Sequence, residues 1–292
     1  MSRKDWLLVL ALSVPWGCSF LFFKVLGETL PPLTIALGRV GIAASALTLA
    51  LCVAGRTMRR LRSEWRGLLA LGLLNNALPF TLFAWGETKV SSGMAAILNA
   101  LAPILTVLVL RVVTGSPLGW NKVVGAVVGF GGVVVLVGPA DAGGFAGAAS
   151  CLLAAFSYAL STPIMARLRR LPPILVADGQ LIASTLLLLP FAAMIERPWT
   201  LPMPDGATWA ALLALALFST AVAYVIYFKL VSSAGPANAM LVTYVIPVTA
   251  LILGNLALGE AITVRALMGM GIILAGLALL DGRLMQRKAK PA

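Results

Sequence analysis

The chain has 292 residues, of which 60% are hydrophobic and 11% are charged, and its mean hydropathy is +0.99. A soluble domain carries about 25% charged residues, so this composition excludes an ordinary soluble protein. Its hydrophobicity also excludes a disordered chain. The sequence has no histidine, which excludes a Ser-His-Asp triad and metal sites built on imidazole. We therefore expect an all-α integral membrane protein.

Uncharged stretches predict ten transmembrane helices, because a helix needs about 20 apolar residues to cross a bilayer. The expected spans cover residues 6–23, 33–54, 67–86, 90–110, 123–139, 147–166, 174–195, 209–228, 237–258 and 266–280. The connections between them are short and rich in Pro, Gly and Ser, so no room is left for a soluble domain.

The formal net charge of +12 is distributed unevenly over the loops. If the N-terminus lies inside, 17 of the 22 Lys and Arg fall in cytoplasmic segments, four fall outside, and Arg39 lies within a span. Cytoplasmic loops of membrane proteins carry such an excess of Lys and Arg. We therefore expect a multi-pass protein of the plasma (inner) membrane with both termini cytoplasmic, and we attribute the basic charge to topology and not to nucleic-acid binding.

An internal repeat relates the two halves of the chain. A shift of 144 residues aligns 65–132 with 209–276 without a gap, and 12 of these 68 positions are identical. Upstream, a shift of 142 pairs Trp16 with Tyr158, and a shift of 141 pairs Arg39 with Gln180. Each half contains five spans, and because five is odd the second half enters the membrane from the opposite side. We therefore expect two inverted five-helix repeats, 1–140 and 141–292, that together form one transport domain, since inverted repeats are typical of secondary transporters.

Several short motifs resemble one membrane-protein family. They are the opening Pro15-Trp16-Gly17-Cys18-Ser19-Phe20, the Pro31-Pro32 pair followed by Arg39, the turn Leu258-Gly259-Glu260 and the glycine pattern of the last span. This ordered set resembles the EamA family of the drug/metabolite transporter (DMT) superfamily, and within it the aromatic amino-acid exporters. The resemblance covers nearly the whole chain and implies ten helices in an inverted arrangement and export of small metabolites. The second half departs from the first at Tyr158 and Gln180, so a strictly symmetric site is not expected.

Polar and aromatic residues recur at matched positions in the two repeats. Asn76, Phe80 and Phe83 are spaced by four and three residues and share one helical face. Their counterparts are Thr220, Tyr224 and Tyr227. Ordinary aromatic packing between helices would give the same pattern, but a tyrosine hydroxyl facing lipid would be unsatisfied. We therefore expect these faces to line a substrate cavity.

Two prolines lie within the fourth and ninth spans, at Pro103 and Pro247. Each removes a backbone hydrogen bond, so each is a candidate hinge, with a simple packing kink as the alternative. Asn99 and Thr243 lie one turn earlier and are expected to meet polar groups of the substrate. The expected substrate-binding residues, including those on the first and sixth spans, are Trp16, Asn76, Phe80, Phe83, Asn99, Tyr158, Thr220, Tyr224, Tyr227 and Thr243.

Few charges lie deep in the membrane. Arg39 and Asp178 are the deepest, and a structural anchor and a functional role are both open for them. We expect Lys24, Glu87 and Glu260 at the outer interface. Without histidine, proton coupling could depend only on Asp178, Glu87 or Glu260, so we expect facilitated transport.

The sequence thus predicts an exporter of small metabolites that works by alternating access, with aromatic or hydrophobic amino acids as the foremost substrates. Other small neutral or drug-like compounds are the alternative substrates. An intramembrane enzyme and a non-transporting membrane scaffold are the alternative classes, and the sequence offers no catalytic pairing to support an enzyme. The expected partners are a small-molecule substrate and the lipid bilayer, with no nucleic acid, no cofactor and no metal, and with a monomer as the working expectation.

Overall fold

The computed structural model describes residues 1–56, 58–115, 117–139 and 142–281. Within these ranges every regular element is a helix, and nine helices are long and apolar enough to cross a membrane. A tenth apolar helix, Val242–Leu258, is shorter. The predicted all-α fold with ten spans is therefore confirmed.

The first five spans come from residues up to Val137. They are α1 (Arg3–Leu26), α2 (Pro32–Val53), α3, η2 and α4 (Trp65–Gly72, Leu73–Ala77 and Leu78–Gly86), α5 and α6 (Ser92–Asn99 and Ala102–Thr114) and α7 (Trp120–Val137). A short 3-10 segment, η1 (Met58–Glu64), precedes the third of them.

The second five spans follow the same order. They are α8 (Ala142–Arg167), α9 with η4 (Pro173–Phe191 and Ala192–Glu196), α10, η6 and α11 (Gly206–Leu213, Ala214–Val222 and Ala223–Ala234), α12 and α13 (Pro236–Ala239 and Val242–Leu258) and α14 (Val264–Asp281). Two short 3-10 segments, η3 (Leu168–Arg170) and η5 (Pro198–Thr200), lie in the connections. The expected repeat boundary at 140/141 falls outside the described residues.

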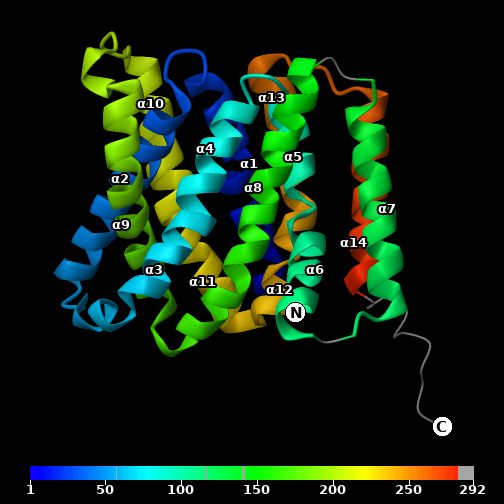
Figure 1. Cartoon of the computed structure of the whole chain (residues 1–292), viewed down its shortest axis with the longest axis horizontal. Coiled ribbons are helices and arrows are strands. Elements are labelled where there is room, and N and C mark those ends of the chain that lie inside the picture. The colour runs from blue at the N-terminus through cyan, green and yellow to red at the C-terminus, as the bar shows by residue number, and fades with distance from the viewer. Residues whose placement is uncertain (57, 116, 140–141, 282–292) are drawn as a thin grey trace.

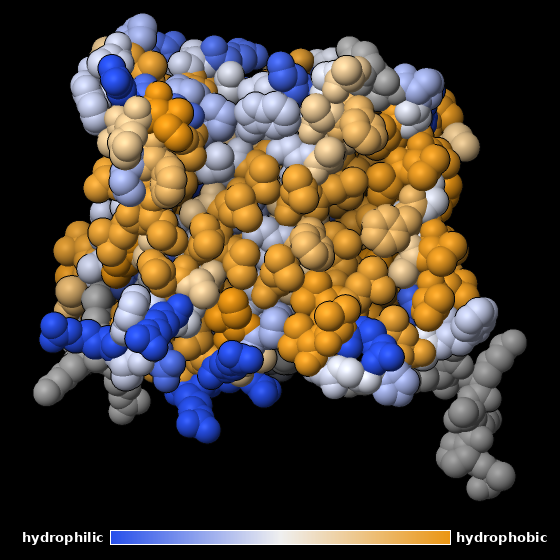
Figure 2. Space-filling view, in the orientation of Figure 1, coloured by the Kyte–Doolittle hydropathy of each residue, from blue (hydrophilic) through white to orange (hydrophobic). Residues whose placement is uncertain are grey.

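The outer surface of the bundle is apolar over the middle of the helices. Figure 2 shows a broad hydrophobic belt with hydrophilic residues gathered at the two ends of the molecule. Large apolar side chains project into this belt, and Leu256, for example, is 77% exposed. Such side chains would be unfavourable in water but are stable against lipid acyl chains, so the surface is that of a membrane-embedded protein.

Contacts between helices come in pairs that the repeat exchanges. Contacts of α1 with α13 match those of α8 with α6, and contacts of α1 with α11 match those of α8 with α4. In the same way α2 meets η6 while α9 meets η2. Equivalent spans also meet one another, as α2 meets α9 and α7 meets α14, which stand side by side at one edge of the bundle (Figure 1). This exchange of contacts confirms the inverted relation between the two halves.

Helix ends follow the same repeat. Gly115 and Gly259, which the shift of 144 pairs, end α6 and α13 in the left-handed conformation with φ of +69° and +66°. Glycine takes this conformation without the steric penalty of a Cβ atom. Both helices therefore stop at equivalent positions for the same local reason.

Candidate functional site

The third and eighth spans each contain a π-helical segment at equivalent places. These are η2 and η6, and the shift of 144 maps all of η2 into η6. A π segment widens the helix by one residue, loosens its backbone hydrogen bonding and is frequent at functional sites. Asn76 lies in η2 and its counterpart Thr220 lies in η6. The repeat-matched polar residues thus occupy the π segments of the third and eighth spans.

Side chains from other helices satisfy backbone carbonyls beside η2. The Ser157 hydroxyl donates to the carbonyl of Leu74 at 2.6 Å, and the Ser184 hydroxyl lies between the carbonyls of Gly72 at 2.9 Å and Gln180 at 2.5 Å. In η6 the Thr220 hydroxyl donates to the carbonyl of Leu215 at 3.0 Å. Hydroxyl groups in the membrane interior therefore compensate for the loosened ladder, as a bilayer requires.

A network of side-chain hydrogen bonds joins the two repeats at this level. Gln180 Nε2 donates to the Tyr224 hydroxyl at 3.2 Å, and that hydroxyl donates to Asn76 Oδ1 at 3.0 Å. Asn76 Nδ2 in turn donates to Ser184 Oγ at 3.2 Å, and Asn75 Nδ2 donates to Gln180 Oε1 at 3.1 Å. Asn76 and Ser184 are fully buried, so the network is a structured polar layer inside an apolar bundle.

Aromatic rings surround this polar layer. Trp16 contacts Tyr227 with ring centroids 5.5 Å apart, and Phe83 contacts Tyr158 at 6.2 Å. Phe228 joins the rings of Tyr224 and Tyr227, at 6.0 and 5.5 Å. Five of the rings keep intermediate exposure, namely Trp16, Tyr158, Tyr224, Tyr227 and Phe228, whereas Phe80 and Phe83 are buried. A small molecule that reached the partly exposed rings would meet π faces first and buried polar groups behind them.

Arg39 of α2 lies in the same layer. Its Nε donates to Thr220 Oγ1 at 2.9 Å, and its guanidinium carbon lies 3.7 Å from the centre of the Phe80 ring and 5.0 Å from that of Phe23. The side chain is 5% exposed. The repeat therefore places a cation at one end of the polar layer and the neutral Gln180 at the other.

Eight of the ten residues expected to bind substrate lie in this region. They are Trp16, Asn76, Phe80, Phe83, Tyr158, Thr220, Tyr224 and Tyr227. Among the described side-chain contacts, none joins Asn99 or Thr243 to them. Asn99 Oδ1 is buried without a hydrogen-bond partner, and the Thr243 hydroxyl donates to the carbonyl of Met240 at 2.7 Å. These two residues are candidates for a separate subsite on the fourth and ninth spans.

The two candidate hinge prolines have different surroundings. Pro103 lies in the first turn of α6, directly after the break at Ala100 and Leu101 that separates α5 from α6. Pro247 lies inside α13, which continues through it. Pro103 therefore lies at an interruption of its span, and a proline in a first turn removes no helical hydrogen bond. Pro247 lies within a continuous helix.

Several members of the polar layer were not among the residues expected from the sequence to bind substrate. Gln180, Ser184, Phe23 and Phe228 contact residues expected to bind substrate, and Asn75 joins the layer through Gln180. Gln180 and Ser184 are four residues apart and therefore share a helical face. That spacing of two polar residues within an apolar span was the signal that could have found them.

Two glutamates of the second repeat cap helices of the first repeat. The Glu196 carboxylate accepts hydrogen bonds from the backbone nitrogens of Leu33 and Thr34 at 2.9 and 2.6 Å. The Glu260 carboxylate accepts from Ser92 N at 2.9 Å and from the Ser92 hydroxyl at 2.7 Å. A carboxylate at a helix N-terminus is favourable because it meets free N–H groups and the positive end of the dipole. These caps hold the two repeats together at one end of the bundle.

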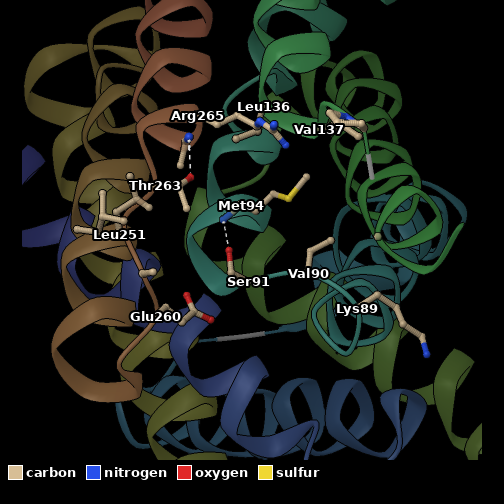
Figure 3. A pocket seen from close by; sticks show the side chains of 15 residues that line it. Lys89, Val90, Ser91, Met94, Leu136, Val137, Leu251, Glu260, Thr263 and Arg265 are labelled. Carbon is tan, nitrogen blue, oxygen red and sulfur yellow. Dashed lines mark hydrogen bonds between the residues drawn. The ribbon is translucent and has the colours of Figure 1, made fainter. Parts of the chain in front are cut away.

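A recess of about 380 Å³ opens beside the Glu260 cap. Figure 3 shows the Glu260 carboxylate and Ser91 on one side, with Arg265, Leu136 and Val137 across from them. The recess does not include the polar layer around Asn76 and Tyr224. This recess therefore lies apart from the expected substrate residues.

Glu87, directly after α4, is buried and not interfacial as expected. The side chain is 1% exposed, and neither carboxyl oxygen has a hydrogen-bond partner. Lys24 Nζ donates instead to the backbone carbonyls of Glu87 and Val90, at 2.7 and 3.1 Å. Burial, followed by the charge of Glu260, raises the pKa of Glu87 well above its ordinary value, against the lowering effect of Lys24 and Arg39. This environment favours the protonated carboxyl.

The described residues contain no group of three or more His, Cys, Asp or Glu that could hold a metal ion. The chemistry of the site consists of hydrogen-bonding amides and hydroxyls, aromatic faces and one guanidinium. This set can bind and release a small molecule.

The ten spans and the two repeated halves are the architecture of a membrane transporter. The model of the EamA-like transporter family matches residues 4–138 and 145–280, so the chain belongs to the EamA-like transporter family, within the DMT superfamily. The two matches also correspond to two repeated halves.

Curated relatives of similar length carry transporter names. An uncharacterized transporter of Archaeoglobus fulgidus is 28% identical over 279 residues, which cover 94% of this chain and 97% of that protein. A probable terminal-alkyne amino-acid exporter of Streptantibioticus cattleyicolor is 29% identical over 99% of this chain and 96% of that protein. The uncharacterized inner membrane transporter YedA of Escherichia coli (strain K12) is 28% identical over 92% and 88%. One solved crystal structure matches the whole of both chains with a TM-score of 0.69 at 19% identity, and it shares the fold.

Proposed function

We propose that this protein exports aromatic and hydrophobic amino acids across the inner membrane by alternating access. In this proposal the halves 1–140 and 141–292 move relative to one another, and the substrate binds between them. Both termini lie in the cytoplasm, as the distribution of Lys and Arg favours. The binding residues are those expected from the sequence, with Pro103 and Pro247 as hinges.

The observation that carries the proposal is the polar layer at η2 and η6. Both segments are irregular, both carry repeat-matched polar residues, and Tyr224 of one repeat donates to Asn76 of the other at 3.0 Å. A site at the interface of two inverted repeats is the common arrangement in secondary transporters. Because these residues belong to different repeats, relative movement of the repeats would open and close the layer.

The chemistry of the layer favours zwitterionic substrates that have an apolar part. Asn76 and Thr220 offer hydrogen bonds to polar groups, and Tyr224 and Tyr227 offer rings to an apolar side chain. Sugar phosphates would require several clustered Arg or Lys, whereas Arg39 is the one cation in this layer among the described residues. The amino-acid exporter of S. cattleyicolor supports the choice of amino acids.

The test is transport in proteoliposomes that contain the purified protein. Uptake of a radiolabelled aromatic amino acid is measured in the presence of each of the twenty amino acids and of neutral drug-like compounds. Competition confined to aromatic and hydrophobic amino acids supports the proposal. Competition by the drug-like compounds alone would assign the protein to the second substrate class.

Variants of the layer connect transport to this site. Losing one hydrogen bond to the substrate weakens binding by roughly 1–2 kcal/mol, or about 5- to 30-fold. We expect N76A and Y224A to reduce uptake by such a factor while inserting normally. V134A is the control, because Val134 lies on α7 and is 73% exposed. Uptake by both variants at the rate of V134A would place the site elsewhere.

A further inference from the structure

Arg39 is a buried cation in the middle of a membrane span. It is 5% exposed and lies on α2. Removing a guanidinium from water is unfavourable unless the charge is paired, and charges within membrane helices usually mark functional sites. The charge of Arg39 therefore needs a partner.

The protein itself supplies only part of the interactions that the buried charge of Arg39 requires. The ring of Phe80 lies against the guanidinium at 3.7 Å, and Nε donates to Thr220 Oγ1 at 2.9 Å. The terminal nitrogens Nη1 and Nη2 have no hydrogen-bond partner among the described residues. The donors best suited to a planar two-oxygen group are thus unused.

No carboxylate in the described part of the chain forms a hydrogen bond with Arg39. Glu87 has no hydrogen-bond partner at either oxygen and so does not bond to Arg39. Glu196 and Glu260 accept from the first turns of α2 and α5. Asp178 accepts from Thr48 at 2.8 Å through Oδ1, and its Oδ2 has no partner. Among the described residues, none of these carboxylates accepts a hydrogen bond from Arg39.

The residue at the equivalent position of the second repeat has its hydrogen-bonding groups satisfied within the protein. Gln180, the counterpart of Arg39, is neutral. Its Oε1 accepts a hydrogen bond from Asn75, and its Nε2 donates one to the Tyr224 hydroxyl. Gln180 is satisfied within the protein, and Arg39 is not. The inverted repeat thus places Gln180, whose hydrogen bonds are satisfied, and Arg39, whose charge is not paired, at equivalent positions of the same polar layer.

We propose that Arg39 binds the carboxylate of the transported substrate through its terminal nitrogens, with the rings of Phe80 and Phe23 fixing the plane of the guanidinium. This inference rests on the proposed function, and it makes a carboxylate a required feature of the substrate. The amino group then lies toward the amide and hydroxyl groups around Asn76 and Tyr224. Amines, amides and neutral drugs of the same shape lack the group that Arg39 recognises.

The test compares a carboxylate with its matched amide. Phenylalanine and phenylalaninamide have the same ring and amino group, and the amide lacks the negative charge. Uptake of each by proteoliposomes is measured for the wild type, R39Q, R39K and R169Q. Arg169 lies at an exposed position of η3, so R169Q controls for loss of one arginine away from the layer.

We expect the wild type to prefer phenylalanine by at least tenfold. R39Q should lower phenylalanine uptake by about tenfold or more and change phenylalaninamide uptake by less than twofold, because only the carboxylate loses its partner. R39K should restore part of the preference, since it keeps the charge without the planar fork. Equal losses of both compounds in a correctly folded R39Q would show a structural role and overturn the inference.

A binding measurement tests carboxylate recognition by Arg39 independently of transport. In detergent, phenylalanine should raise the melting temperature of the wild type more than phenylalaninamide does, and R39Q or R39K should reduce that difference. If R39Q does not fold, R39K and the wild-type preference remain as readouts, and a wild type that binds both compounds equally overturns the inference. The wild type could neither transport nor bind any aromatic amino acid and still bind other carboxylates in a way that R39Q abolishes. In that case the proposed amino-acid export fails and the role of Arg39 stands.

Discussion

Gly125 of α7 and Gly276 of α14 touch through their backbones. A Cβ atom built on Gly125 would lie 2.6 Å from the carbonyl oxygen of Gly276, and one built on Gly276 would lie 2.6 Å from the carbonyl oxygen of Gly125. The shift of 144 converts this pair into Gly269 and Gly132, where the same distances are 3.1 and 3.0 Å. Small residues let membrane helices approach closely. The fifth and tenth spans are therefore joined by two equivalent glycine contacts.

We expect G276A to destabilise the protein, because the added methyl group would meet backbone atoms that cannot move aside. Overpacking of this kind typically lowers the free energy of unfolding by about 1–3 kcal/mol. Thermal unfolding in detergent measures the effect. G271A is the matched control, since Gly271 lies on the same helix with nothing within 4 Å of its built Cβ atom. An equal loss of stability in both variants would contradict the close packing.

The Glu260 cap leads to a prediction about the outer ends of the helices. E260A removes the acceptor for Ser92 N and the Ser92 hydroxyl, and hydrogen bonds to a charged group contribute about 1.5–3 kcal/mol. We expect a lower melting temperature and faster thiol labelling of a cysteine placed at Met94, which lines the adjoining recess. E28A is the control, because Glu28 is exposed. Unchanged labelling in E260A would show that the cap does not hold this end closed.

Glu87 should make stability depend on pH. Its pKa is raised in the folded protein, mainly by burial. The pKa of a glutamate in an unfolded chain is about 4.3. The folded state therefore binds the proton more tightly, and stability falls as the pH rises from the unfolded toward the folded pKa. E87Q is neutral at every pH, so its melting temperature should exceed that of the wild type at pH 8, and the difference should shrink toward pH 5.

The control for Glu87 is E28Q, which removes an exposed carboxyl from the neighbouring loop. We expect E28Q to follow the wild-type pH profile. If E87Q also follows the wild-type profile from pH 5 to pH 8, Glu87 does not titrate as its buried position indicates.

Single cysteines test the proposed orientation. Arg62 and Gly206 are exposed and fall in loops that the charge distribution assigns to opposite sides of the membrane. On a background in which Cys18, Cys52 and Cys151 are replaced, a membrane-impermeant thiol reagent added to intact cells should label G206C and not R62C. Labelling of R62C alone would reverse the orientation, and labelling of both would contradict the ten-span topology.

The sequence by itself determined the number of spans and the repeat. In a bilayer each segment must satisfy its backbone hydrogen bonds internally, so an apolar stretch of sufficient length becomes a helix whatever its neighbours are. Apolar length therefore predicted the spans, and the odd number in each half predicted the inversion. Matched polar and aromatic positions also identified Asn76, Thr220, Tyr224 and Tyr227 before any contact was known.

The tertiary structure alone decided which of these residues meet. Arg39 donates to Thr220 across 181 positions of the chain, and Glu260 caps Ser92 across 168. The burial of Glu87, the satisfied amide of Gln180 and the unused nitrogens of Arg39 follow from the same long-range packing. Hydropathy places a residue at a depth in the membrane, but it is nearly the same around these helices and so does not choose the neighbours. That choice depends on the close fit of side chains from distant segments, which exists only once all ten helices are assembled.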